Sequence, residues 1–143
     1  MNKFGGKWTN IKLNILETYT RQFLKVFKNK PFIKLLYFDG FAGSGEILIK
    51  DNEDRPIEGS VRRILSINEP RQFNMYYFVE KKKKYAKSLE NLIKNEFPGR
   101  EIYVTAEDCN KKLDDLSKFL KSEKGSDFKV LGFIDPKGMQ LEW

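Results

Sequence analysis

The sequence predicts an α/β domain in which helices cover both faces of a parallel sheet. Short apolar runs without polar alternation are typical of buried parallel strands, and they recur at 33–38, 75–79, 102–104 and 130–134. Stretches with helical periodicity separate them, so strand and helix alternate as right-handed crossover connections require. At 143 residues and 40% hydrophobic composition, the chain can bury a core without a disulfide or a metal. We therefore expect one domain over 1–143, with 1–30 as an N-terminal helical extension.

Two residue types that are scarce or missing exclude several kinds of chemistry. The chain has one cysteine, Cys109, and no histidine, so it cannot build an internal disulfide, a cysteine-rich zinc site or a Ser-His-Asp triad. No metal site is expected, and Cys109 is expected to be a small half-buried residue rather than a nucleophile. The apolar runs are too short for a bilayer and no signal peptide precedes them, which favours a cytoplasmic protein without a membrane partner.

The first elements are predicted from helical periodicity and from residues that cap or end a helix. Thr9 or Asn10 offers a cap for an amphipathic helix over 10–28, and Pro31 stops it. The strand at 33–38 comes next and runs into Asp39 and Gly40. Its continuous apolar character suits a strand that is covered on both faces.

The middle of the chain alternates in the same way. The polar stretch 46–59 indicates an exposed loop or a small hairpin, after which Ser60 is expected to cap a short helix ending near Leu65. The strand at 75–79 leads to Glu80, and a helix over 82–97 follows it.

The last elements repeat this order. The strand at 102–104 is followed by Asp108 and a helix that closes near Gly125. The fourth strand, 130–134, runs into Asp135 and Pro136. Because the carboxyl ends of parallel strands share one edge, this order gathers Asp39, Glu80, Asp108 and Asp135 where open α/β sheets bind ligands.

The segment from Asp39 to Gly45 has the clearest chemical character. Gly43 and Gly45 allow a tight turn and close approach of the backbone to a ligand, and the following helix start would offer free amides. No Gly-Lys-Ser/Thr follows, so it is not the phosphate loop of ATPases, and the Gly-x-Gly-x-x-Gly spacing of dinucleotide enzymes is missing as well. The alternative is a plain glycine turn between strand and helix.

Two further acidic residues fit a nucleoside ligand. Glu80 ends its strand where a carboxylate can accept bonds from both ribose hydroxyls, although it could equally be a solvated strand end. Asp108 is placed to meet an adenine amino group. It could also be a helix N-cap, and the two roles are compatible.

The spacing Asp-x-Phe-x-Gly-x-Gly resembles the first motif of S-adenosylmethionine-dependent methyltransferases, in the Phe-Ala-Gly-Ser-Gly form of amino-methylating enzymes. The resemblance implies a catalytic role for Asp135 and Pro136 beside the transferred methyl group. Lys137 and Gly138 stand where those enzymes carry a second proline and an aromatic residue. The cofactor-binding residues that it implies are Asp39, Phe41, Gly43, Ser44, Gly45, Glu80 and Asp108.

Over nearly its whole length the chain also resembles the three-Cys-motif partner proteins. The residues that carry this resemblance are Lys7 to Thr9, Tyr37 to Gly45, Gly59 and Ser60, Phe78 to Glu80, and Gly132 to Trp143. It implies a Rossmann-like class I methyltransferase fold of three α/β/α layers, with S-adenosylmethionine as cofactor and a three-Cys-motif protein as partner. Because such domains continue into further strands, the chain looks like an N-terminal portion, truncated after the fourth strand. That strand would leave an exposed edge through which copies could oligomerise.

Two functions from different classes follow from these observations. The first is a methyltransferase acting on an amino group of nucleic acid, in keeping with a net charge of +7 and a pI near 9.4. The second is a non-catalytic module that binds the cofactor or serves as an adaptor for its partner. A dehydrogenase-like nucleotide domain is disfavoured by the missing glycine spacing. The run from Lys81 to Lys84 is expected to be a solvated surface or a phosphate-binding one.

Overall fold

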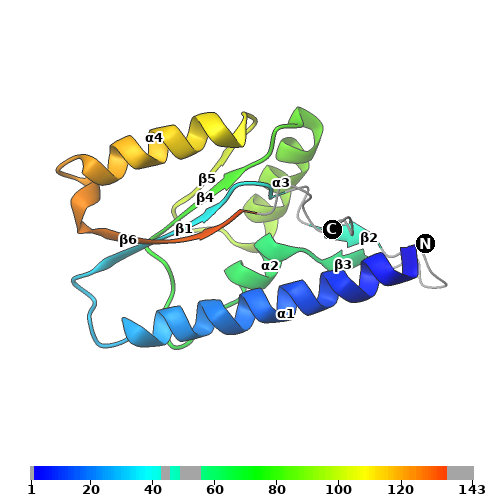
Figure 1. The fold of residues 1–143 in the computed structure, drawn as a ribbon, viewed down its shortest axis with the longest axis horizontal. Coiled ribbons are helices and arrows are strands. Elements are labelled where there is room, and N and C mark those ends of the chain that lie inside the picture. The colour runs from blue at the N-terminus through cyan, green and yellow to red at the C-terminus, as the bar shows by residue number, and fades with distance from the viewer. Residues whose placement is uncertain (1, 43–45, 49–55, 135–143) are drawn as a thin grey trace.

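The structure, a computed structural model, describes residues 2–42, 46–48 and 56–134. Its centre is a four-stranded parallel sheet in the order β5-β4-β1-β6 (Figure 1). The strands are β1 (Lys34–Asp39), β4 (Met75–Val79), β5 (Ile102–Thr105) and β6 (Phe128–Phe133). A short antiparallel hairpin of β2 (Glu46–Leu48) and β3 (Pro56–Glu58) stands apart from it. The small hairpin considered for 46–59 is thus present.

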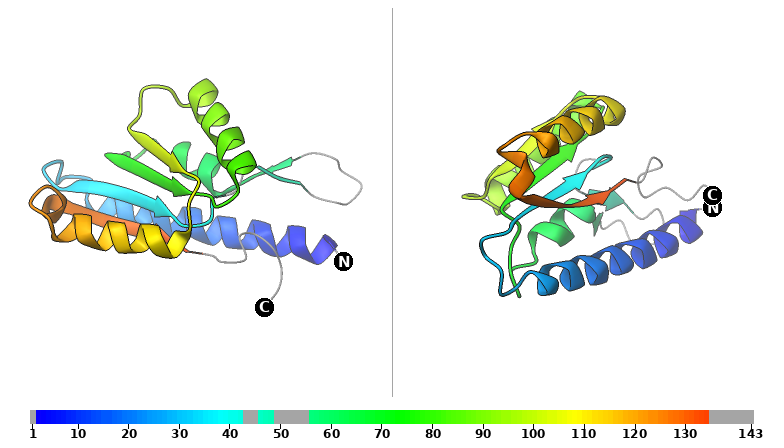
Figure 2. Two further views of the ribbon diagram at one scale, coloured as in Figure 1. Left: turned by 90° about the horizontal axis from the view of Figure 1, so that it is seen from above. Right: turned by 60° about the vertical axis from the view of Figure 1, so that its left-hand side comes forward.

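The helices form layers on both faces of the sheet (Figure 2). One face packs against α1 (Asn2–Val26), α2 (Ser60–Leu65) and α3 (Lys83–Glu96), and α4 (Cys109–Lys121) lies over the other. A single 3-10 turn, η1 (Gly125–Asp127), leads into β6. The predicted three-layer α/β/α architecture is confirmed, with strands within two residues of their predicted ends.

The strand order has the Rossmann-like pattern. In sequence order the parallel strands run third, second, first, fourth across the sheet, because β4 and β5 extend from one side of β1 and β6 lies on the other. The direction of winding therefore reverses between β1 and β6. In open parallel sheets ligands bind outside the carboxyl ends of the strands at this kind of reversal.

The main core lies between the sheet and the three-helix layer. Every residue of β1 from Leu35 to Asp39 is buried, as expected for a strand covered on both faces. Tyr37, Phe73 and Tyr76 form edge-to-face ring contacts with centroids 5.5 Å apart. Aromatic pairs of this geometry add to the free energy gained from burying their area. These contacts pack the loop before β4 against β1 and the amino end of β4.

Three sequence expectations about helix starts are wrong. The first is the helix expected directly after Gly45, where strand β2 begins at Glu46 and the next helix begins only at Ser60. Helix α1 begins at Asn2, ahead of the cap expected at Thr9 or Asn10. Once the packed part of a helix has formed, each further turn upstream adds hydrogen bonds without a new nucleation cost, and no proline stops it. Ser60 is the first residue of α2 rather than its cap, a position that Gly59 holds.

The connection from α1 to β1 is fixed by one arginine. The Arg71 guanidinium donates to the carbonyl oxygens of Phe27 (3.0 Å), Lys30 (3.1 Å) and Ile33 (2.5 Å). It also donates to Asn74 Oδ1 at 2.9 Å, and Asn74 Oδ1 accepts from the amide of Leu35 at 2.8 Å. The turn at the amino end of β1 is thus tied to the loop before β4.

No helix in the described part of the chain is long and apolar enough to cross a membrane.

Candidate functional site

The carboxyl ends of the four strands are joined sideways by main-chain hydrogen bonds. The amide of Gly40 donates to the carbonyl of Phe133 on β6 at 3.0 Å. The amide of Ala42 donates to Val79 on β4 at 2.9 Å, and the amide of Glu80 donates to Thr105 on β5 at 2.9 Å. The residues that leave β1 and β4 therefore start from fixed positions along one edge.

Asp39 is buried, and its carboxylate accepts hydrogen bonds from other groups of the protein. Its side chain is 0% exposed, with Oδ1 accepting from the amide of Phe41 at 3.1 Å and Oδ2 accepting from Ser60 Oγ at 2.8 Å. A buried carboxylate needs such donors, because removing it from water without them is costly. Asp39 therefore shapes the turn after β1 and ties it to α2. Sequence reasoning missed this role of Ser60, although the pair Gly59 and Ser60 was singled out.

Gly40 is required by close packing. A Cβ at this position would lie 2.5 Å from Cys109 Sγ and 3.3 Å from a methyl carbon of Ile134. Cys109 is buried, and burial raises the pKa of its thiol, with a further contribution from Asp108 and Asp39. A raised pKa disfavours the reactive thiolate. Cys109 thus packs the start of α4 against the end of β1, in agreement with its expected structural role.

Glu80 stands at the end of β4 with its side chain half-buried. Its Oε2 accepts from the amide of Lys82 at 2.8 Å, which fixes the carboxylate beside the start of α3. This contact holds the carboxylate at the carboxyl edge of the sheet, where the sequence predicts a diol ligand.

Asp108 is the N-cap of α4. Its Oδ2 accepts from the amide of Asn110 at 3.0 Å, and its side chain is exposed at the same edge of the sheet. The capping role is therefore present, and it does not occupy the second carboxylate oxygen. Sequence reasoning treated capping and ligand binding as compatible, and the structure leaves both possible.

Beside Asp108, Glu107 forms a charged cluster that sequence reasoning missed. Its carboxylate accepts from Lys112 Nζ at 2.7 Å, Lys111 Nζ at 3.0 Å and Thr105 Oγ1 at 2.9 Å. These contacts, the one from Lys112 foremost, lower the pKa of Glu107 to about 2. The cluster joins the end of β5 to α4. The four-residue spacing of Glu107 and Lys111 was the available signal.

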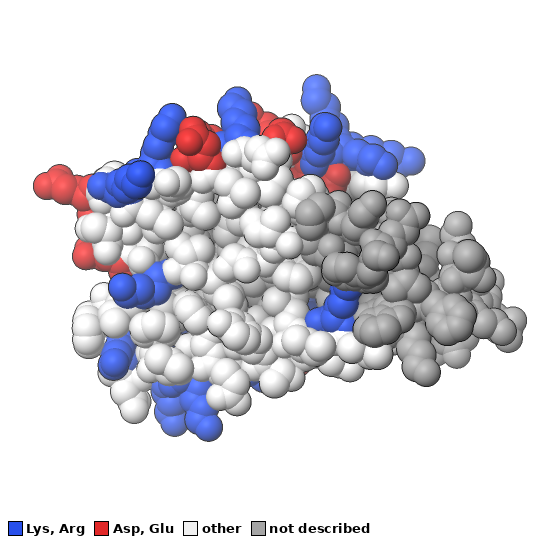
Figure 3. Space-filling model, in the orientation of Figure 1, with Lys and Arg blue, Asp and Glu red and all other residues white. Residues whose placement is uncertain are grey.

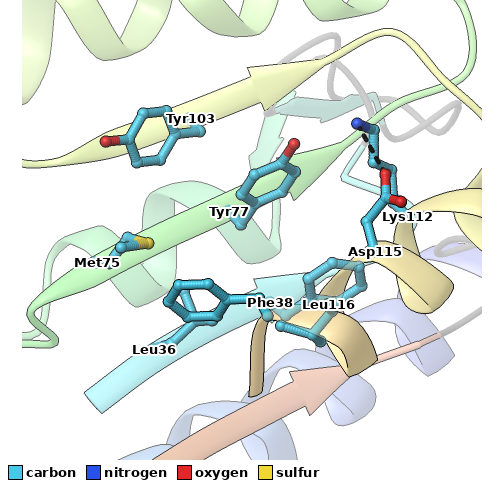
Figure 4. Close-up of a pocket in the computed structure, with 9 residues that line it drawn as sticks. Leu36, Phe38, Met75, Tyr77, Tyr103, Lys112, Asp115 and Leu116 are labelled. Carbon is cyan, nitrogen blue, oxygen red and sulfur yellow. Dashed lines mark ion pairs between the residues drawn. The ribbon is translucent and has the colours of Figure 1, made fainter. Parts of the chain in front are cut away.

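A groove of about 300 Å³ opens on the other face of the sheet, under α4 (Figure 4). Its walls are mostly apolar, and the ion pair between Lys112 and Asp115 (3.4 Å) lies at one end. None of the predicted site residues lines it. The lining residues are Leu36, Phe38, Met75, Tyr77, Tyr103, Lys112, Asp115, Leu116 and Phe119.

Several predicted site residues lie outside the described residues. They are Gly43, Ser44 and Gly45 of the loop, and Asp135 and Pro136 after β6. The structure therefore brings Asp39, Phe41, Glu80 and Asp108 to one edge. Among the residues that it describes, no cluster of histidine, cysteine or acidic side chains could hold a metal ion.

The edge just described belongs to an α/β domain whose strand order reverses, as it does where open parallel sheets bind ligands. No family model matches the chain, and no curated protein matches it. Among solved structures it is similar to the crystal structure of protein LPL1258 from Legionella pneumophila strain Philadelphia 1, assigned to family model DUF519. The two share 17% sequence identity with a TM-score of 0.58, over 82% of this chain and 53% of that one. The chain thus spans about half the length of that protein, and at this identity the similarity concerns the fold alone.

Proposed function

We propose that the chain is a methyltransferase domain of the three-Cys-motif partner type, which binds S-adenosylmethionine at the carboxyl edge of its sheet. The observation that carries the proposal is the reversal of strand order between β1 and β6, next to a turn fixed by a buried aspartate. Glu80 and Asp108 stand at the ends of the next two strands along that edge. The motif from Asp39 to Gly45 supplies the chemical identity of the proposed ligand.

The residues take distinct roles in this proposal. Glu80 accepts hydrogen bonds from the ribose hydroxyls, and Asp108 meets the adenine amino group. Asp39 contributes indirectly, because both of its oxygens accept bonds within the protein and thereby hold the turn that leads to Gly43, Ser44 and Gly45. Phe41 gives an apolar contact at the start of that loop.

When bound, the cofactor supplies an electrophilic methyl group on its sulfonium. The protein's task is to place an acceptor amine in line with it, and such positioning needs neither metal nor histidine. Asp135 accepts a hydrogen bond from the acceptor amino group, and Pro136 shapes the backbone beside it. We propose an amino group of nucleic acid as the acceptor and the cytoplasm as the compartment.

The test is calorimetric titration of S-adenosylmethionine and S-adenosylhomocysteine into the chain and into a Glu80→Gln variant. Glutamine keeps an oxygen for the amide of Lys82 but loses the charge that strengthens bonds to a diol. We expect binding to weaken about 10- to 100-fold, the range for losing a charge-assisted hydrogen bond. Glu90→Gln, at an exposed position on α3, is the matched control and should bind normally. A folded protein that binds neither compound would overturn the proposal.

An adaptor that binds a three-Cys-motif protein without catalysis is the second candidate. The apolar groove under α4 and the broad uncharged area in Figure 3 favour it, because both offer surface for a protein partner (Figures 3 and 4). The Asp135→Ala variant separates the two functions. In an enzyme it retains cofactor binding and loses methyl transfer, whereas in an adaptor partner binding is unchanged and neither protein transfers methyl groups.

A further inference from the structure

The start of α3 carries a concentrated positive charge. Lys81, Lys82, Lys83, Lys84 and Lys87 are all exposed, and we call this set the α3 lysine patch. In the described part of the chain, none of the five makes an ion pair. On α4, by contrast, exposed lysines form ion pairs, Lys111 with Glu107 at 3.0 Å and Lys118 with Asp114 at 3.1 Å. The patch is therefore an uncompensated charge rather than part of a surface ion-pair network.

This arrangement works against the helix that carries it. The first turn of α3 has no acidic residue, although the amino end of a helix bears partial positive charge and favours anions. Lys83 and Lys87 are four residues apart, so they repel each other along the same face. The carboxylate of Glu80, which accepts from the amide of Lys82, compensates only in part. A bound polyanion would relieve both penalties.

An aromatic ring lies within the patch. Tyr85 is 39% exposed, and Lys82 Nζ lies 5.2 Å from the centroid of its ring. Proteins bind single-stranded nucleic acid through two features that occur here together. Positive side chains contact the phosphates of its backbone, and exposed aromatic rings stack on its bases. A helix start alone would bind any small anion, but the ring selects a ligand that also carries planar bases.

We infer that the α3 lysine patch, with Tyr85, binds single-stranded nucleic acid and delivers it to the edge where Glu80 stands. The patch begins at the residue after Glu80, so a single-stranded nucleic acid bound to it lies next to the proposed cofactor site. The inference rests on the proposed function in naming the class of methyl acceptor. The binding itself does not depend on methyl transfer.

The first experiment measures fluorescence anisotropy of a labelled, mixed-sequence single strand of roughly 20 nucleotides, longer than the roughly 4–16 that a single binding domain covers. Titrations run between about 50 and 200 mM salt. The test variant carries Lys83→Gln, Lys84→Gln and Lys87→Gln. The matched control carries Lys118→Gln, Lys121→Gln and Lys124→Gln, which remove the same charge from exposed positions on and after α4.

We expect the α3 variant to bind at least about tenfold more weakly, and its slope of log affinity against log salt to fall by about 2, at about 0.7 for each lost phosphate contact. The α4 variant should change far less. Equal losses in the two variants would show a general effect of net charge and overturn the inference, as would no loss in the α3 variant.

A second pair of variants tests the ring. Tyr85→Ala should weaken binding at least about fivefold without changing the salt slope, because stacking neutralises no phosphate. Tyr85→Phe keeps the ring and should bind as the unaltered protein does. If Tyr85→Ala binds normally, the ring has no part and the patch is a site for phosphate alone.

The calorimetric titration of S-adenosylmethionine distinguishes failure of the proposed function from failure of the nucleic-acid inference. The α3 variant should bind S-adenosylmethionine as the unaltered protein does, since none of its substitutions touches Glu80. If neither protein binds the cofactor, the proposed function fails, and the salt slopes still decide whether the patch binds nucleic acid.

Discussion

At the carboxyl edge, some residues of the predicted site form internal hydrogen bonds or close packing contacts that stabilise the turn after β1. Asp39 is fully buried and accepts from Phe41 and Ser60, so its charge organises the turn. Gly40 is buried where a side chain has no room. The motif that draws attention in the sequence thus begins with two residues whose first task is structural.

The contact between Gly40 and Cys109 gives a prediction at this scale. Gly40→Ala should destabilise the protein by about 1–3 kcal/mol, the usual cost of overpacking, because the new Cβ would lie 2.5 Å from Cys109 Sγ. In a Cys109→Ala background the same substitution should cost at least about 1 kcal/mol less. Urea unfolding of the four proteins measures this coupling.

Gly132→Ala is the control, because a Cβ at that position meets nothing within 4 Å. Its unfolding midpoint should stay close to that of the unaltered protein. Equal costs of Gly40→Ala in the two Cys109 backgrounds would mean that the sulfur is not what excludes a side chain.

Among the elements, the connection between α1 and β1 depends on a single side chain. Arg71 donates to three carbonyls of the turn and to Asn74, and only a planar guanidinium can direct donors to four acceptors in this way. The long first helix is thereby fixed to the sheet at the end opposite the candidate site.

Arg71→Lys should lower the free energy of unfolding by about 2–4 kcal/mol, since an ammonium group cannot reach all four acceptors and leaves carbonyls unpaired. Arg21→Lys, on the exposed side of α1 where Arg21 pairs with Glu17 at 3.0 Å, should change it by less than about 1 kcal/mol. Denaturant unfolding at one pH compares the two variants. Similar small losses would show that the turn holds without Arg71.

At the scale of the whole molecule, the sequence predicts what local pattern determines and misses what contacts across the chain determine. Strand 75–79 was predicted to the residue, because β4 is a continuous apolar run between polar residues. The partnership of Ser60 with Asp39 spans 21 residues, and no periodicity reports it. The carboxyl-edge positions of Asp39, Glu80 and Asp108 followed from strand ends alone. The contact of Glu107 with Lys112, by contrast, required the packing of α4 on β5.

The outer edge of β6 gives a prediction for the assembled protein. In the described part of the chain β6 pairs with β1 alone, and one charged residue, the exposed Lys129, lies on it. Figure 3 shows a broad uncharged area with Lys and Arg side chains at its margins. The rest of the strand is apolar or glycine, and an open edge of this kind pairs readily with another, so we expect copies of this chain to associate through β6 as concentration rises. Light scattering across a concentration series measures the mass.

Gly132→Lys should keep the chain monomeric, because it adds a second charge to that of Lys129 on the edge strand and this exposed position has room for a side chain. Ser117→Lys adds the same charge at an exposed position of α4 and should leave association unchanged. A monomer at every concentration of the unaltered chain would contradict the expectation.

The three sideways bonds from Gly40, Ala42 and Glu80 run between main-chain atoms only. Apart from a proline, which lacks the donor, nearly any residue can supply such a bond, so the bonds themselves impose little selection on side chains. At Gly40 the selection comes instead from its packing against Cys109. Proteins that share such a frame can therefore differ in their catalytic residues. The similarity at 17% sequence identity concerns the backbone alone, so the chemistry performed at this edge has to be established separately for each protein.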